Sequence, residues 1–390
     1  MDILDEAIVD REAFPSFRTR VLSAPSLARS GDSVLAVFRT GSAKVSPDGR
    51  IGARVSRDAG RTWGPAPGPF DGLDDGRNHA GSHVAGGDGR GGPILAIAAR
   101  FAMTAPGMPG WDADRAGIVD ADAVVSRRDA DGHWSVPLVI DARRHADEWA
   151  IACGPAVALG GGEWIQPMER HDRSDRPDWQ KRYHAFALRS HDDGRSWPDE
   201  LAMPNDPSGR LAHYDQRLTT TADGRLLSFA WIHDVVDDRT LHARVAHSAD
   251  GGVTWSEPVE TSLHGGPVNP ITLRDGRVLI AYARREPPAG IRLAVSVDAA
   301  DPWTFDEEVE LYDGVRRVVT GVVAGGPRPV SPIRSGARCG AGRSAARARS
   351  SSPTARCSWR SSRWTRAAST RSGACGSASE PSASGGGHRA

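Results

Sequence analysis

The segment HYDQR, residues 213–217, is the densest run of chemically reactive side chains in this 390-residue sequence. Side chains alternate between the two faces of a strand, so His213, Asp215 and Arg217 are expected to share one face. A carboxylate and an imidazole can exchange protons with a substrate, and a guanidinium can bind a carboxylate through two hydrogen bonds. We predict that Asp215, His213 and Tyr214 are catalytic. Arg217 is predicted to bind substrate, the alternative being a solvated salt-bridge cluster at a strand start.

Four further charged residues are candidates for substrate contact. Arg18 and Arg20 lie just before the first expected strand, and Arg39 ends the strand that contains the apolar run 34–38. Glu148 precedes the expected strand 149–157. Side chains at the ends of strands often line binding sites. The alternative for each is an ordinary surface charge, because charged residues are mostly exposed.

Two histidines, His79 and His83, stand at the start of the second repeat unit described below. On a strand, residues four positions apart are separated by about 13 Å, which makes a shared metal ion awkward. We therefore predict that His79 contacts substrate or is structural, and we expect no metal. The sequence has no phosphate-binding loop, dinucleotide glycine motif or Cys–His zinc spacing, so we expect no cofactor.

An internal repeat predicts the strands that must position these residues. The pattern S-x-D-x-G-x-[ST]-W begins at Ser56, Ser190 and Ser248, and looser copies begin at Ser126 and Ser296. This spacing, about 50 to 70 residues, is typical of propellers and other repeat arrays. The aspartate can hold a turn by accepting backbone hydrogen bonds, and the tryptophan can pack between neighbouring units. We therefore expect these aspartates to be structural rather than catalytic.

A second repeated element is an Asp-Gly hairpin between apolar runs, at 223–224 and 275–276. Each unit then contains two strands joined by a hairpin, a variable loop, a third strand, the repeat turn and a fourth strand. That order predicts a four-stranded antiparallel blade, and residues 1–328 show no good helix pattern. The expected fold is therefore an all-β propeller.

Charge and cysteine usage limit the setting of the protein. The 49 basic and 49 acidic residues leave no formal net charge. The first residues lack the apolar run of a secretory signal, and no window holds the roughly 20 apolar residues of a membrane span. Cys153 is the only cysteine before residue 331, so we expect no disulfide framework. These features favour a cytoplasmic protein without a membrane partner.

Residues 329–390 differ from the preceding domain, residues 1–328, because Ser, Arg, Ala and Gly dominate and Glu380 is the only acid. Such a segment can be a basic tail that binds nucleic acid, or a disordered segment that buries too little apolar surface to fold. A frameshift in a GC-rich gene gives the same composition. We favour the frameshift, since a sixth unit is missing where a propeller must close, and we expect no nucleic-acid partner.

The repeat resembles the Asp box, or BNR repeat, of the sialidase (neuraminidase) superfamily, over roughly residues 15–310. The resemblance implies a six-bladed propeller whose last blade is built jointly by N-terminal and C-terminal strands. Five blades are legible here. Residues 1–15 and 311–330 would supply part of the sixth, which we expect to be incomplete. The same box also occurs in propellers that only bind.

The resemblance further implies an active site at the end of the blades opposite the boxes. In that family three arginines bind the substrate carboxylate, a tyrosine paired with a glutamate is the nucleophile, and an aspartate is the acid/base. This sequence departs from that pattern, because Ser23 stands where the first arginine is expected. Asp215 stands at the position of the glutamate, and the tyrosine and third arginine cannot be assigned.

We therefore expect a sialidase-like glycoside hydrolase, of the exo-α-sialidase type, that acts on terminal acidic sugars. Asp215 would replace the glutamate or serve as acid/base, and Arg217, Arg20 and Arg39 would hold the sugar carboxylate. One alternative is a non-catalytic propeller that binds carbohydrate or protein, which the serine at position 23 favours. Another is an inactive truncated or frameshifted product.

Overall fold

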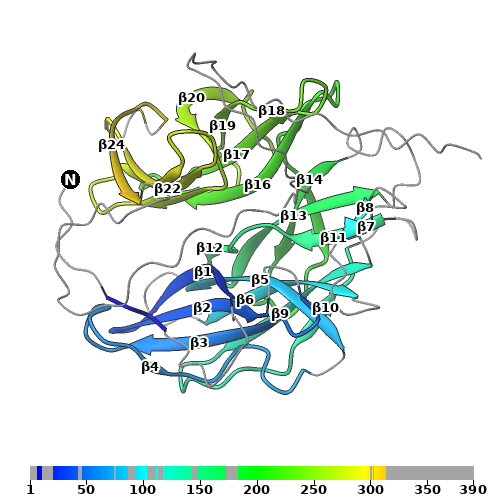
Figure 1. Ribbon diagram of the computed structural model, residues 1–390, viewed down its shortest axis with the longest axis vertical. Helices are drawn as coiled ribbons and strands as arrows, with labels where there is room; N and C mark the ends of the chain where they lie inside the picture. Colours follow the sequence, from blue (N-terminus) through cyan, green and yellow to red (C-terminus); the bar gives the residue numbers. More distant parts are fainter. Residues whose placement is uncertain are drawn as a thin grey trace, which may run out of the picture. The chain divides into compact units, whose positions relative to one another are not determined.

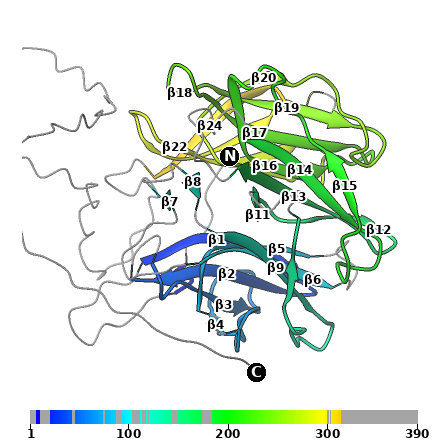
Figure 2. The same cartoon turned by 90° about the vertical axis from the view of Figure 1, so that its right-hand side faces the viewer.

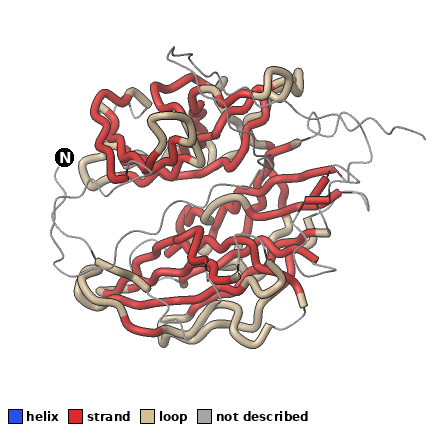
Figure 3. The backbone as a smooth tube through the Cα atoms, in the orientation of Figure 1, coloured by secondary structure: helices blue, strands red, loops and turns tan. Residues whose placement is uncertain are grey.

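A computed structural model of the chain describes residues 7–10, 21–42, 46–73, 76–86, 93–102, 111–112, 117–118, 120–142, 148–172, 183–298, 301 and 303–312. Every regular element among these residues is a β-strand (Figure 3). The strands form five antiparallel sheets of four or five strands, which follow one another along the chain (Figure 1). We call these sheets blades 1 to 5.

Each blade takes its strands from one continuous part of the sequence. Blade 1 contains β1 (Val21–Ser30), β2 (Ser33–Gly41), β3 (Arg50–Ser56) and β4 (Gly64–Pro65). Blade 2 contains β5 (Arg77–Gly86), β6 (Ile94–Ala102), β9 (Ala121–Arg128) and β10 (Leu138–Ile140). A separate pair, β7 (Trp111–Asp112) and β8 (Gly117–Ile118), lies in the connection between β6 and β9.

The remaining blades repeat this plan. Blade 3 contains β11 (Glu148–Ala152), β12 (Val157–Gly160), β13 (Glu163–Asp172), β14 (His184–Ser190) and β15 (Asp199–Ala202). Blade 4 contains β16 (Leu211–Thr220), β17 (Leu226–Asp234), β18 (Arg239–Thr240), β19 (His242–Ser248) and β20 (Val259–His264). Blade 5 contains β21 (Val268–Thr272), β22 (Val278–Arg284), β23 (Gly290–Ser296) and β24 (Phe305–Tyr312).

Successive blades pack face to face through apolar clusters. The central strands are covered on both faces, and this explains why β6 is buried without interruption from Ile94 to Phe101. Complete burial of one large apolar side chain stabilises a fold by about 1.5–3 kcal/mol. Four of these clusters join blades 1 and 2, 2 and 3, 3 and 4, and 4 and 5. They include, in that order, Val37 with Ala96, Leu95 with Trp164, Ile165 with Leu226, and Phe229 with Ile280.

The repeat turns join the third and fourth strands of their blades. In blade 3 the Ser190 hydroxyl donates to Asp192 Oδ1 at 2.9 Å and accepts the Gly194 N–H at 2.8 Å. Asp192 also accepts the N–H and the hydroxyl of Ser196, at 2.8 and 2.6 Å. The turns that begin at Ser56 and Ser248 make the same set of bonds. The expected structural role of these aspartates is confirmed.

The Asp-Gly hairpins are also found where the sequence places them. Thr221 and Arg225 close the turn between β16 and β17, and Gly224 has a φ of +84° within it. Gly276, with a φ of +87°, occupies the same position between β21 and β22. The first strands of neighbouring blades contact each other, as β1 contacts β5 (Figure 2) and β16 contacts β21. This arrangement of sheets is that of a β-propeller.

The expected number of blades is corrected. The described residues form five blades rather than six, because the segments assigned to the sixth, 1–15 and 311–330, lie almost entirely outside them. The domain boundary at 328–329 and the tail 329–390 lie outside the described residues as well. Within the part of the chain that the structure describes, no helix has the length and apolar character needed to cross a membrane.

Candidate functional site

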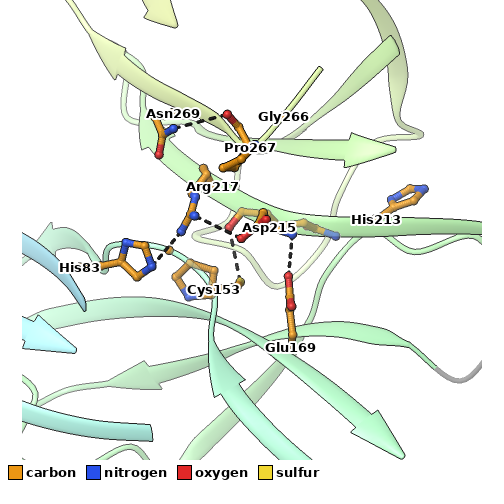
Figure 4. A network of polar contacts seen from close by, with 12 residues as sticks. His83, Cys153, Glu169, His213, Asp215, Arg217, Gly266, Pro267 and Asn269 are labelled. Carbon is orange, nitrogen blue, oxygen red and sulfur yellow. Dashed lines mark hydrogen bonds and ion pairs between the residues drawn. The ribbon is translucent and has the colours of Figure 1, made fainter. Parts of the chain in front are cut away.

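Polar side chains gather at the end of the blades opposite the repeat turns. The third strand of each blade leads into its repeat turn. Because neighbouring strands are antiparallel, the first strand begins and the second strand ends at the opposite end of the blade. At the junction of blades 3 and 4, this end brings together Glu169 and His171 near the end of β13 and residues 213–217 near the start of β16. Figure 4 shows how Glu169, Asp215 and Arg217 approach one another.

A β-bulge interrupts β16 within the predicted catalytic segment. Tyr214 pairs with Trp231 and Arg217 with Phe229, so β16 carries one more residue than β17 between these pairs. Asp215 lies in the bulge with a φ of +50°. Its carboxylate pairs with Arg217, with Oδ1 and Nη2 3.2 Å apart. The expected neighbourhood of Asp215 and Arg217 is therefore present.

His213 departs from the expected shared face. Its Nδ1 donates to the Pro204 carbonyl at 3.1 Å, and its ring points away from Asp215 and Arg217 (Figure 4). The reason is the bulge, which breaks the simple alternation of side chains. Burial, together with the positive charge of Arg244, lowers the pKa of His213 to about 4. His213 is a buried neutral residue at neutral pH.

Glu169 connects blade 3 to blade 4. Its Oε1 accepts the Asp215 N–H at 2.6 Å, and its Oε2 lies 3.3 Å from His171 Nε2. The Tyr183 hydroxyl also hydrogen-bonds to this carboxylate. Burial alone would raise the pKa of Glu169, but the hydrogen bond and charge of His171, with the bonds from Tyr183 and Asp215, hold it below its usual value. Glu169 is therefore an ionised buried carboxylate.

Tyr183 precedes β14 and lies between two acceptors. Burial, and then the nearby Glu169 carboxylate, raise the pKa of Tyr183 well above its usual value. Its hydroxyl donates to the His213 carbonyl at 2.8 Å and also contacts Glu169. Because a phenol has one proton, it can donate to only one of these acceptors at a time. Tyr183 is thus a neutral phenol beside an ionised carboxylate.

Three half-buried aromatic side chains form a row beside Asp215. The ring centres of Tyr183 and Tyr214 are 4.6 Å apart, and those of Tyr214 and Trp231 are 5.6 Å apart. Burial, and then the charge of Glu169, raise the pKa of Tyr214 to about 12, so its phenol is neutral. We call Tyr183, Tyr214 and Trp231 the aromatic row. Rings of this kind can stack against a sugar.

Arg285 extends the aromatic row from blade 5. Its guanidinium carbon lies 4.4 Å from the centre of the Trp231 ring, and its Nε donates to the Gly266 carbonyl at 3.2 Å. A Cβ on Gly266 would lie only 2.4 Å from Trp231, so the close approach of this backbone requires glycine. The exposed Arg285 side chain has no partner for its terminal nitrogens among the described residues. It presents a planar cation that can receive an anion.

Arg217 is buried and reaches a residue of blade 2. Its Nη1 lies 3.2 Å from His83 Nε2, and its aliphatic part packs where a Cβ on Gly154 would come within 3.0 Å. A guanidinium only donates, so the neutral His83 must accept through Nε2 and carry its proton on Nδ1. Burial, and then the charge of Arg217, lower the pKa of His83 well below its usual value. Arg217 therefore ties blade 4 to blade 2.

The other predicted binding residues lie apart from this cluster. Arg39 is fully buried, and it donates to the His79 carbonyl at 3.0 Å and to Ser46 Oγ at 2.9 Å. Burial lowers the pKa of Arg39, and its bonds join blade 1 to blade 2. The predicted contact of Arg39 with substrate is not supported, because its guanidinium is buried and bonded within the fold. The buried His79 ring contacts Phe70, with their centres 5.5 Å apart.

Three predicted residues receive little or no description. Glu148 begins β11 and pairs with Asp172 of β13 in the sheet register. This places it at the correct end of blade 3, but the structure does not describe its side chain. Arg18 and Arg20 lie outside the described residues. Their assignment as substrate-binding residues stays a prediction.

Sequence reasoning missed Glu169, His171 and Tyr183 as members of the site. Glu169 and His171 are two positions apart near the end of β13, so they face the same side of the sheet. The ends of second strands and the starts of third strands meet the starts of first strands at one end of a blade. That rule would have directed attention to all three residues. No group of three or more His, Cys, Asp or Glu residues suited to a metal ion occurs among the described residues.

No protein-family model matches the sequence, and no curated protein matches it either. Solved structures do resemble the fold. A protein of unknown function from Dyadobacter fermentans DSM 18053 is 22% identical, with a TM-score of 0.60 over 77% of this chain and 85% of that one. At this level of identity the likeness concerns the fold alone.

Two enzymes are similar at lower identity. Trypanosoma rangeli sialidase, solved with the inhibitor DANA, is 12% identical with a TM-score of 0.52 over 77% of this chain and 49% of that one. The chain thus spans about half the length of that sialidase. Penicillium chrysogenum α-L-arabinanase, solved with arabinobiose, is 13% identical with a TM-score of 0.50 over 73% of this chain and 80% of that one. The chain therefore shares the propeller fold of enzymes that act on glycosides.

Proposed function

We propose that this protein is a glycoside hydrolase of the exo-α-sialidase type that acts on terminal acidic sugars. The observation that carries the proposal is the meeting of Glu169, Tyr183 and Asp215 beside the aromatic row. This cluster lies at the end of the blades opposite the repeat turns. Sialidase and arabinanase structures with related propellers support a carbohydrate as the ligand.

Two groups of the cluster suit cleavage of a glycosidic bond. The Asp215 side chain is 32% exposed, against 6% for Arg217, and is the acid most open to a ligand. It would protonate the leaving oxygen and later activate water. Tyr183 would attack the anomeric carbon as its phenolic proton passes to the Glu169 carboxylate. Tyr214 would contact the sugar ring, and His213 has no direct part in this scheme.

The charge of the substrate would be recognised by Arg285. Stacking on Trp231 and the bond to Gly266 fix the plane of its guanidinium. A planar guanidinium held in this way can bind a carboxylate through two parallel bonds. Arg217 would act indirectly, because it is buried and holds the Asp215 carboxylate.

Hydrolysis of a fluorogenic α-sialoside tests the proposal, with two arginine variants compared. Arg285→Ala should raise KM about tenfold or more, since a hydrogen bond to a charged group contributes about 1.5–3 kcal/mol. Arg277→Ala is the matched control, because Arg277 is exposed, pairs with Asp275 and belongs to the hairpin at the other end of blade 5. Equal KM values in the two variants would contradict the role of Arg285. Absence of hydrolysis by the wild-type chain would contradict the proposed function.

One observation favours a second candidate, a propeller that binds carbohydrate without cleaving it. Arg39 and Arg217, both expected to hold a carboxylate, are buried and bonded to other residues of the chain. A set of three arginines that could bind one substrate carboxylate is therefore not found among the described residues. Titration calorimetry with sialyllactose separates the candidates, because heat of binding without release of sialic acid identifies the second.

A further inference from the structure

We infer that Glu169 is a positioning residue that holds the backbone of Asp215 in its left-handed conformation and thereby directs the Asp215 carboxylate. The catalytic consequence of this role rests on the proposed function. The role itself concerns the fold and can be measured without substrate.

The conformation of Asp215 needs an external partner. Its φ of +50° lies in the left-handed region, which costs a residue with a side chain about 1 kcal/mol or more. Aspartate tolerates the region better than most residues, but it remains less stable there than in a regular strand. Some contact must favour this backbone over the extended one.

Glu169 supplies that contact from the neighbouring blade. Asp215 lies in the bulge between the pairs Tyr214–Trp231 and Arg217–Phe229, outside the regular register with β17. Glu169 Oε1 accepts the Asp215 N–H at 2.6 Å. Such a bond to an ionised acceptor is about twice as strong as one between neutral groups.

The acceptor is itself held in place. Glu169 is 6% exposed, and its other contacts come from His171 on the same strand and Tyr183 at the start of β14. Turning the carboxylate away would break its bonds to the Asp215 N–H and to His171. On the other side, Arg217 holds the Asp215 carboxylate at 3.2 Å. Backbone and side chain of Asp215 are thus fixed by different residues, Glu169 and Arg217.

Hydrogen exchange of the full chain, read by mass spectrometry on peptides covering residues 211–218, tests the contact directly. In Glu169→Leu one amide of this segment should exchange about tenfold faster or more, as expected when a hydrogen bond to a charged group is lost. Glu169→Gln keeps an oxygen acceptor and should show a smaller increase. Peptides of blade 5 serve as the internal control for the fold. Unchanged exchange at the Asp215 amide in Glu169→Leu would overturn the inference.

A thermal unfolding comparison keeps the inference testable if Glu169→Leu does not fold. Asp215→Ala and Asp215→Gly both remove the carboxylate, but only glycine adopts a positive φ without strain. Adding Glu169→Gln should therefore lower Tm more in the glycine background than in the alanine background, because only alanine recovers strain when the weakened bond lets the backbone relax. Equal lowering of Tm in both backgrounds would overturn the inference.

The two experiments can fail independently of the proposed function. If the exchange and Tm results come out as expected while no sialoside is hydrolysed, the positioning role stands and the hydrolase proposal falls. If sialoside is hydrolysed while Glu169→Leu leaves the Asp215 amide protected, the hydrolase stands and the positioning role falls.

Discussion

The aspartates of the repeat turns and Asp215 occupy opposite ends of the blades and are held in different ways. Asp192 is bound by Ser190 and Ser196, which lie within four residues of it. The backbone of Asp215 is bound by Glu169, 46 residues away, and its carboxylate by Arg217. The carboxylate oxygens of Asp192 accept hydrogen bonds from its own turn. The carboxylate of Asp215 is partly exposed and pairs with Arg217.

This contrast separates an acid that builds the fold from an acid suited to chemistry. Partial burial opposes ionisation of Asp192, but the bonds from Ser196 and Ser190 lower its pKa to about 2. An acid with so low a pKa cannot donate a proton at neutral pH. The Asp215 carboxylate pairs with Arg217 and is 32% exposed, so a ligand can reach it.

The largest effect expected from this contrast is on catalysis. Asp215→Asn should lower kcat for a fluorogenic α-sialoside by about 10²-fold or more, because the variant cannot transfer a proton. Asp192→Asn should leave kcat unchanged, since Asp192 lies at the other end of blade 3. Steady-state kinetics with both variants checks this. A comparable loss of kcat in the two variants would mean that the ends of the blades are not functionally distinct.

The next effect concerns His213, which lies beside Asp215 in sequence but is buried in the fold. Its pKa of about 4 lies below the ordinary value of 6.5, so folding favours the neutral ring. The resulting stability is complete above pH 6.5 and is lost as the pH falls toward 4, by on the order of 3 kcal/mol. Urea unfolding of wild type and His213→Gln between pH 7.5 and 4 measures it.

The expected result is a weaker dependence of unfolding free energy on pH in His213→Gln than in the wild type. His133→Gln is the matched control, because the His133 side chain is 81% exposed, and it should follow the wild-type curve. If His213→Gln also follows the wild-type curve, the buried neutral state assigned to His213 is wrong.

The smallest effect belongs to a repeat turn. Removing the charge in Asp192→Asn should cost about 1 kcal/mol at neutral pH, a modest value because the side chain is largely solvated. The folded pKa is depressed, so the contribution is present above about pH 4 and disappears as the pH falls toward 2. Urea unfolding at pH 7 and pH 2.5 checks this. A difference between variant and wild type that does not shrink at pH 2.5 would contradict the assignment.

The repeat turns and hairpins could be predicted from the sequence because their contacts are local. The bonds of Asp58 run to Ser56 and Thr62, and all three residues belong to one eight-residue pattern. The Asp-Gly hairpins carry their own requirement for positive φ at Gly224 and Gly276. The number of blades was harder to predict, because the segments assigned to the sixth blade lack a repeat turn.

The candidate site was only partly accessible because its contacts are distant in sequence. Asp215 and Arg217 were found as a local cluster, but no neighbouring residue indicates their distant partners. Glu169 lies 46 residues from Asp215, and His83 lies 134 residues from Arg217. The bulge was also invisible, and it moved His213 away from the expected face. Arg39 shows the reverse error, because its position at a strand end predicted exposure while its bonds to blade 2 bury it.

The tryptophans of the repeat turns carry a consequence for how the chain is assembled during synthesis. Trp134 of blade 2 donates to Pro67, which follows blade 1, and Trp255 of blade 4 donates to Ala202 of blade 3. Trp197 and Trp303 pack into the clusters shared with the blade before theirs. Each blade is therefore finished only when the next one has left the ribosome. A nascent chain halted between blades would expose one uncovered apolar face, to which a chaperone could bind.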